Sequence, residues 1–325
     1  VFFVLAPQLL WGQHRWSCHL FRVASMPASI DELVTQLSKT RNPKEQLSSL
    51  RLLSTLGLPH WKGCRRVLDV AYSYLPREEE EIRSAAVDLL GAFATCGEDV
   101  EAARTLMSCL QDPVWHVRRA AVRALAVVAK KGDQNVISRL VQLRHDKDED
   151  VRCAALCTIG HLSGRDDAAV MDHLVSSLGD KADEVRSRAV DVLQKFAEKN
   201  DELAVRSIAN CLAADSTHSR CGAILALERI VTKGDSRAIL AVVSFLEHDQ
   251  HSVRESAAEA LEAIVIKGDA FAVNEVSARL RHKEATVRSA AASVLGRIAR
   301  EHDESVISVL IPCVRDSDES VRVAA

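Results

Sequence analysis

The sequence predicts an all-α fold, a right-handed solenoid in which antiparallel pairs of helices are stacked one on another. Two ladders of residues and a composition that favours helices support this prediction. In the first ladder an arginine recurs every 34 residues after one interval of 35, and in the second an aspartate recurs every 34 residues. Such a period is typical of helical repeats that bury their apolar faces only against their neighbours.

The arginine ladder marks the start of the second helix in each repeat. Alanine stands three residues after each of the first seven arginines, and leucine or isoleucine stands seven residues after it. The small residue lets helices approach closely, and the larger one reaches the layer between repeats. We expect a structural role for the arginines, whose guanidinium groups pair with an aspartate of the same or the next turn. They are Arg83, Arg118, Arg152, Arg186, Arg220, Arg254, Arg288 and Arg322.

The aspartate ladder marks the boundary between repeats. A glycine or asparagine precedes four of these aspartates, so the pair predicts the C-cap of one helix followed by the N-cap of the next. The six aspartates are Asp133, Asp167, Asp201, Asp235, Asp269 and Asp303.

The repeats cover residues 79–325, and the segments outside them differ. Residues 26–78 have helical spacing at 30–37, 46–56 and 67–74, which predicts degenerate helices that cap the array. Residues 1–25 resemble neither a membrane span nor a secretory signal, so we interpret them as a non-structural leader or translated upstream sequence. Ala325 falls within a second helix. We therefore expect a monomeric array within a longer chain, with the last repeat cut.

The pattern Val-Arg-x-Ala-Ala with a preceding aspartate resembles the HEAT repeat family. The last repeat matches it best, through Ile311-Pro312, Asp316, Val321-Arg322 and Ala324-Ala325. The resemblance implies 34-residue helix pairs that form a scaffold, and armadillo repeats are the neighbouring alternative. The family's aspartate six residues before the arginine is present at Asp112, Asp146, Asp180 and Asp316, but Ala214, His248 and His282 replace it elsewhere. A continuous aspartate–arginine ladder is not expected at those three repeats.

Charge and cysteine content limit the class of partner. The net charge of −3 and the isoelectric point near 6.5 provide no long-range field for nucleic acid or an anionic membrane. Protein partners are therefore expected, without nucleic acid or membrane. Nine cysteines are scattered without any C-x-x-C pair, which indicates a reducing, cytoplasmic location.

No motif for catalysis or cofactor binding is present. None of the 12 histidines is followed by glutamate, as metal-binding HEAT enzymes would require, and no phosphate-binding loop or nucleophile elbow occurs. Cys153, Cys157 and His161 share a helical face, but they are too far apart along it to bind one zinc ion together. We expect no enzyme activity, cofactor or metal. The alternative is a HEAT-like lyase subunit of the phycobilisome-lyase type, or another HEAT-repeat enzyme.

Non-core positions of the second helices are the candidate binding residues. Their charge is basic in the early repeats and acidic in the late ones, an order that a protein partner with its own charge pattern could recognise. Trp115 occupies a column that is otherwise mostly polar, so it is a candidate contact residue, with packing on the N-terminal helices as the alternative. The predicted partner-binding residues are Trp115, Arg119, Arg123, His161, Asp191, Glu255 and Glu259.

The fifth repeat departs from the pattern. Ser219 replaces the apolar residue before Arg220, Gly222 replaces alanine, and residues 215–222 are polar. Because glycine inside a helix costs about 1 kcal/mol relative to alanine, we predict a soft joint at this repeat.

Overall fold

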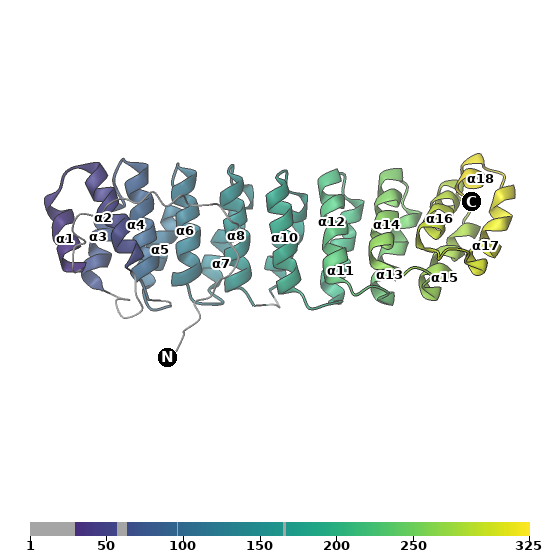
Figure 1. Ribbon diagram of the computed structural model, residues 1–325, viewed down its shortest axis with the longest axis horizontal. Helices are drawn as coiled ribbons and strands as arrows, with labels where there is room; N and C mark the ends of the chain where they lie inside the picture. Colours follow the sequence, from purple (N-terminus) through teal and green to yellow (C-terminus); the bar gives the residue numbers. More distant parts are fainter. Residues whose placement is uncertain (1–29, 57–63, 96, 165–166) are drawn as a thin grey trace.

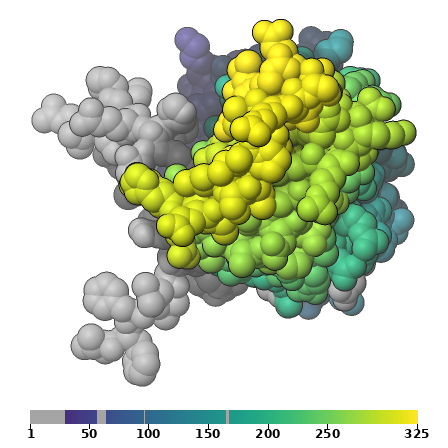
Figure 2. Space-filling model, turned by 90° about the vertical axis from the view of Figure 1, so that its right-hand side faces the viewer, coloured from purple at the N-terminus to yellow at the C-terminus, as the bar shows by residue number. Residues whose placement is uncertain are grey.

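The described residues form a single row of stacked helix pairs. The computed structural model describes residues 30–56, 64–95, 97–164 and 167–325, and these contain eighteen α-helices and no β-strand. The row runs from α1 at one end to α18 at the other (Figure 1). Viewed along the row, the C-terminal helices lie in front of the green and teal repeats (Figure 2). The predicted all-α solenoid is confirmed.

The helices alternate between two kinds, which we name A-helices and B-helices. Three helices precede them: α1 (Ile30–Lys39), α2 (Pro43–Thr55) and α3 (Arg65–Tyr74). The A-helices are α5 (Val100–Cys109), α7 (Gln134–Gln142), α9 (Ala168–Ser176), α11 (Glu202–Asn210), α13 (Ser236–Val243), α15 (Ala270–Ala278) and α17 (Glu304–Leu310). The B-helices are α4 (Glu80–Phe93), α6 (Trp115–Val128), α8 (Glu149–Leu162), α10 (Asp183–Phe196), α12 (Thr217–Ile230), α14 (His251–Ile264), α16 (Ala285–Ile298) and α18 (Glu319–Ala324).

The aspartate ladder begins the A-helices. Each of the six aspartates spaced by 34 residues is the N-cap of an A-helix, and its carboxylate accepts hydrogen bonds from the first backbone N–H groups. These N–H groups have no partner within the helix, so the carboxylate stabilises each start by about 1 kcal/mol. At the other end the A-helices from α7 to α17 tighten into a 3₁₀ turn, as at Ser177–Gly179 after α9. The turn ends the A-helix and leads into the next B-helix.

The B-helices provide most of the core between repeats. The alanine column that includes Ala121 and Ala189 and the leucine column that includes Leu125 and Leu193 are buried in all seven B-helices from α4 to α16. Neighbouring B-helices contact each other along much of their length, whereas neighbouring A-helices contact each other less. The buried layer is continuous along the array, as expected when no repeat is stable alone.

The turns from B-helix to A-helix link one repeat to the next through the backbone. Gly132 has a φ of 81° and lies beyond Ala129, the C-cap of α6. Its N–H donates not to its own helix but to the Leu162 carbonyl at the end of α8, at 2.8 Å. Gly97, Asn200, Gly234 and Gly268 make the equivalent bond to the next B-helix. The expectation that Gly132, Asn200, Gly234 and Gly268 cap the preceding helix is therefore wrong, because an earlier residue is the C-cap in each case and these four connect adjacent repeats.

The arginine ladder links repeats at the opposite edge. The guanidinium of Arg83, Arg118, Arg152 or Arg288 pairs with the aspartate of the following repeat, and these partners are Asp112, Asp146, Asp180 and Asp316. For Arg186, Arg220 and Arg254 the same spacing of 28 residues leads to positions 214, 248 and 282, where alanine or histidine replaces the aspartate. The ladder is thus interrupted at three consecutive interfaces.

The N-terminal segment is helical and packs on the array. Tyr74 at the end of α3 donates its hydroxyl to the Leu37 carbonyl of α1 at 3.1 Å, and Leu50, Leu53 and Val67 are buried. The capping role of residues 26–78 stays a prediction. Residues 1–25 lie outside the described residues.

The fifth repeat contains an uninterrupted helix despite Gly222. α12 runs from Thr217 to Ile230, and Gly222 is buried. A Cβ at this position would lie 2.3 Å from the Leu178 carbonyl oxygen of the preceding repeat. Glycine therefore permits a close backbone approach between the fourth and fifth repeats. The soft joint at residues 215–222 stays a prediction.

Candidate functional site

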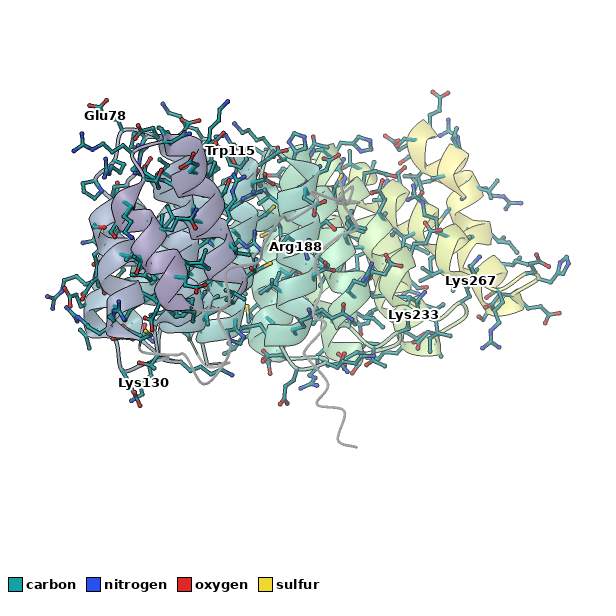
Figure 3. All side chains as sticks on the ribbon, turned by 60° about the vertical axis from the view of Figure 1, so that its left-hand side comes forward. Glu78, Trp115, Lys130, Arg188, Lys233 and Lys267 are labelled. Carbon is teal, nitrogen blue, oxygen red and sulfur yellow. The ribbon has the colours of Figure 1, made fainter. Side chains whose placement is uncertain are left out.

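The predicted binding residues all lie on B-helices. We define the B-face as the exposed side of helices α4 to α16, formed mainly by residues one, five and nine positions after each ladder arginine. Trp115, Arg119 and Arg123 come from α6, and the other members are His161 of α8, Asp191 of α10 and Glu255 and Glu259 of α14. Figure 3 shows Trp115 at the upper edge of the array, Arg188 midway, Lys130 at the lower edge, and Lys233 and Lys267 on the C-terminal repeats below the height of Arg188.

Trp115 belongs to a small aromatic and cationic cluster on α6. Its side chain is 38% exposed, and the Arg119 guanidinium carbon lies 5.0 Å from the centre of the indole ring. The His116 ring meets the indole edge to face at 5.6 Å. Arg119 also pairs with Asp150 of α8 at 2.9 Å. The indole is therefore held in place by its own helix while part of it stays exposed to solvent.

A polar hollow adjoins this cluster. Its volume is about 240 Å³, and it is lined by Arg51, Glu80, Glu81, Ser84, Ala85, Asp88 and His116. Burial raises the pKa of Asp88, although the positive charges of Arg123, Arg119 and Arg51 act in the opposite direction. The side chain still reaches solvent, so the carboxylate is one of the exposed groups that line this concave surface. The sequence did not reveal this hollow because Arg51 belongs to α2, outside the repeat register.

The middle of the B-face is occupied by Arg188 and two cysteines. Arg188 pairs with Glu184 at 3.1 Å and lies 3.8 Å from Asp191. Burial, assisted by the negative charge of Glu184, raises the pKa of Cys153 to about 12. Burial also raises the pKa of Cys157. Both thiols are therefore protonated at neutral pH, which makes them poor nucleophiles and poor metal ligands.

No other feature of the described residues indicates metal or membrane chemistry. They include no group of three histidine, cysteine or acidic side chains placed to hold a metal ion. Seven cysteines lie in this part of the chain, and all are free thiols. No helix in it is both long and apolar enough to cross a membrane.

The late repeats carry the acidic end of the B-face. Glu255 of α14 forms an ion pair with Arg297 of α16, so part of its charge is neutralised. Glu259 and Glu262 are exposed on the same helix, one turn and two turns further on. Leu225 of α12, 52% exposed, separates this acidic end from Arg188. The B-face thus offers a basic and aromatic region at α6, a mixed middle and an acidic region at α14.

Comparison with known proteins identifies the repeat. A family model described as HEAT repeats matches residues 30–126, 103–194 and 171–262, which together span more than half of the chain. The chain belongs to the HEAT repeat family. The first of these matches includes α1 to α3, so the HEAT region begins before the regular ladder. Solenoids of this family are typical of protein-interaction scaffolds.

Several solved structures are similar to this chain at low sequence identity. A chain from a structure of Kap95p with RanGDP is 15% identical, with a TM-score of 0.51, and the match covers 90% of this chain and 43% of that one. An engineered protein is 19% identical, with a TM-score of 0.42 and coverage of 90% and 86%. A designed armadillo repeat protein is 20% identical, with a TM-score of 0.37 and coverage of 73% and 100%. No curated protein matches the sequence.

Proposed function

We propose that this HEAT repeat chain is a non-catalytic scaffold that binds a protein partner along its B-face. The order of charge along that face supports the proposal. Arg119 and Arg123 lie beside Trp115 at one end, whereas Glu259 and Glu262 lie several repeats away. A partner with an acidic segment followed by a basic segment would fit this order in one direction only. Charge of this kind sets orientation and specificity more than affinity.

Trp115 supplies the contact that charge alone lacks. An indole that is fixed by Arg119 and His116 loses little conformational freedom when a partner covers it. Tryptophan and arginine are also enriched among the residues that dominate binding energy. We therefore place the strongest contact at the α6 end of the B-face, with the acidic residues of α14 fixing the direction of the partner.

Charge reversal tests the B-face. The partner is first captured with the unaltered chain and identified by mass spectrometry, and two double variants are then compared: R119E/R123E, and E259K/E262K. Each should weaken capture of the same protein at least tenfold. Lys199→Glu with Lys233→Glu is the matched control for R119E/R123E, because it makes the same change of charge in the turns between repeats, and it should bind normally. Equal loss in this control would mean that net charge, not the B-face, governs binding.

Trp115→Ala separates contact from folding. It should reduce capture while the thermal melting profile stays unchanged, because the indole packs on its own helix rather than in the core. A lowered melting temperature with normal capture would assign Trp115 to packing instead. A tetrapyrrole bound to the purified chain after co-expression would contradict the non-catalytic proposal and favour the lyase alternative.

A further inference from the structure

Four arginines of the ladder show which ligand this side chain takes here. In Arg83, Arg118, Arg152 and Arg288, Nε and Nη2 donate to the two oxygens of one carboxylate at 2.7–3.0 Å. Nη1 donates to backbone carbonyls five and six residues earlier in the chain, in the turn that precedes the same B-helix. The edge formed by Nε and Nη2 is therefore a site for one carboxylate in a fixed orientation.

Three consecutive arginines lack that carboxylate. Arg186 turns to Asp183 of its own helix. Arg220 donates from Nη1 to the Ala214 and Asp215 carbonyls and from Nη2 to the Thr217 hydroxyl at 3.1 Å, and it forms no ion pair within the described residues. Arg254 likewise has no acidic partner there.

Of the three arginines, Arg254 is the one most affected by the missing carboxylate. Its side chain is only 6% accessible, and its Nη1 donates to the His248 and Asp249 carbonyls at 2.8 Å each. Arg288 is held by the equivalent two carbonyls, so the free edge of Arg254 must face position 282 as that of Arg288 faces Asp316. The buried Nε of Arg254 has no hydrogen-bond acceptor.

Histidine at position 282 accepts the backbone hydrogen bond that an aspartate accepts at this position, but not the hydrogen bonds from the arginine. Its Nδ1 accepts the Glu284 N–H at 3.1 Å, as Asp316 accepts the Asp318 N–H at 2.9 Å. The turn is thereby kept, but the arginine receives no acceptor. His248 makes the equivalent hydrogen bond in its own turn, since its Nδ1 accepts the Gln250 N–H at 3.2 Å. An unsatisfied buried N–H destabilises the protein, and a hydrogen-bond acceptor supplied by a partner would remove that cost.

We propose that the edge formed by Arg220 and Arg254 is a second docking site, at which an acidic segment of a protein partner supplies the carboxylates that His248 and His282 do not. The site lies at the turns between A-helix and B-helix and uses no predicted B-face residue. It is therefore independent of the B-face proposal. To reach Nε of Arg254, the carboxylate displaces the His282 ring, which gives up one hydrogen bond from a backbone N–H.

The spacing of the two arginines specifies the partner further. They lie one repeat apart, and packed helix layers are separated by about 8–10 Å. An extended chain in the polyproline II conformation advances about 3.1 Å per residue with three residues per turn, so side chains three residues apart lie on the same side and span one repeat. The best ligand is an extended segment with aspartate or glutamate at every third position.

A synthetic peptide tests the proposal on the unaltered full chain. The probe is acetyl-(Glu-Gly-Gly)4-amide, and the readout is the NMR signal of each arginine Nε–H in isotope-labelled protein. The signals of Arg220 and Arg254 should shift in a saturable manner, whereas the glutamine analogue (Gln-Gly-Gly)4 should shift neither. Shifts confined to other arginines, or equal shifts with the glutamine peptide, would overturn the proposal. Acetate at the same carboxylate concentration should act far more weakly; an equal effect would indicate a site for small anions rather than for a protein segment.

Aspartates placed at the two histidine positions of the ladder give a control variant whose weaker peptide binding cannot be due to unfolding. In H248D/H282D each arginine has a carboxylate of its own, so the peptide should bind at least tenfold more weakly while the protein stays as stable as before or becomes more so. Undiminished binding to this variant would contradict the proposal. The R119E/R123E variant should bind the peptide normally, and this result separates the site from the B-face.

Discussion

Arg152 of α8 and Asp180 of the following repeat form a bidentate ion pair, with Nε and Nη2 at 2.7 and 2.8 Å from the two carboxylate oxygens. The arginine side chain is 4% exposed and the aspartate side chain 12%. The pair also connects two repeats at the edge opposite to the turn of the chain that joins them. Such a group is costly to break from one side, because the remaining charge stays buried.

Asp180→Ala should therefore lower the free energy of unfolding by about 3–5 kcal/mol, the cost of leaving a buried charge unpaired. Urea denaturation followed by circular dichroism measures the loss. Asp183→Ala is the control, because that side chain is 91% exposed and pairs within its own helix, and it should change stability little. Equal losses in the two variants would show that the inter-repeat pair contributes nothing special.

The same ion pair predicts that the free energy of unfolding depends on pH in the acid range. Burial alone would raise the pKa of Asp180, but hydrogen bonds from Arg152 and the Ala182 N–H outweigh it, so the pKa lies below its ordinary value of 3.8. The unfolded chain then binds the proton more readily than the folded chain. The contribution of the pair is complete at neutral pH and is lost only as the pH falls below about 4. Asp180→Asn should remove this part of the acid transition in urea titrations at pH 3 to 5.

His282→Asp should stabilise the late repeats, because it gives the buried Nε of Arg254 the acceptor it lacks. The arginine is already desolvated, so the added carboxylate restores hydrogen bonds without burying a second unpaired charge. We expect a gain of about 1–2 kcal/mol. Amide hydrogen exchange in α14 and α16 should slow by about five- to thirtyfold, as 1.4 kcal/mol corresponds to tenfold. His251→Asp makes the same substitution at an exposed position of α14 and should leave exchange unchanged.

The helices and their starts could be predicted from the sequence because they depend on local spacing. Every aspartate of the ladder, such as Asp269, caps an A-helix, and the columns of Ala257 and Leu261 are buried. A repeat pattern states which residues are equivalent, but it does not state which turn faces which. Where a ladder arginine has a carboxylate partner in the next repeat, that partner is 28 or 29 residues ahead of it, and this relation required the structure.

The candidate site was predictable to a similar extent. Position within the repeat places Arg123 and Glu259 on the B-face, because exposed positions recur with the same period as buried ones. The same reasoning missed Asp88 and its hollow, since Arg51 comes from a helix without the repeat signature. It also treated Gly132 as a helix cap, although its N–H binds the next repeat.

Gly222→Ala should destabilise the protein even though alanine is the better helix former. The added Cβ would lie 2.3 Å from the Leu178 carbonyl oxygen, which belongs to the backbone and moves only with its repeat. We expect a loss of about 1–3 kcal/mol in urea denaturation. Gly296→Ala in α16 is the matched control, because nothing lies within 4 Å of its Cβ, and it should stabilise by about 0.5–1 kcal/mol. A stabilising effect at both positions would mean that the fourth and fifth repeats can separate freely.

His173 of α9 should make the array sensitive to mild acid. Its side chain is 1% exposed and neither ring nitrogen has a hydrogen-bond partner. Burial, together with the positive charge of Arg144, lowers its pKa from 6.5 to about 4. The unfolded chain therefore takes up the proton at a higher pH than the folded chain, so stability falls as the pH drops from about 6.5 towards 4.

His173→Leu should remove this dependence and fill the same apolar space without an unpaired N–H. At pH 5.5 the unaltered chain should have lost about 1 kcal/mol through this histidine, with a limit of about 3 kcal/mol near pH 4. Urea denaturation at pH 7.5, 6.5, 5.5 and 4.5 measures both proteins, and the variant should show the shallower decline. His161→Gln, a change at an exposed histidine of α8, should keep the original slope. If His173→Leu kept that slope as well, the acid sensitivity would have to come from other groups.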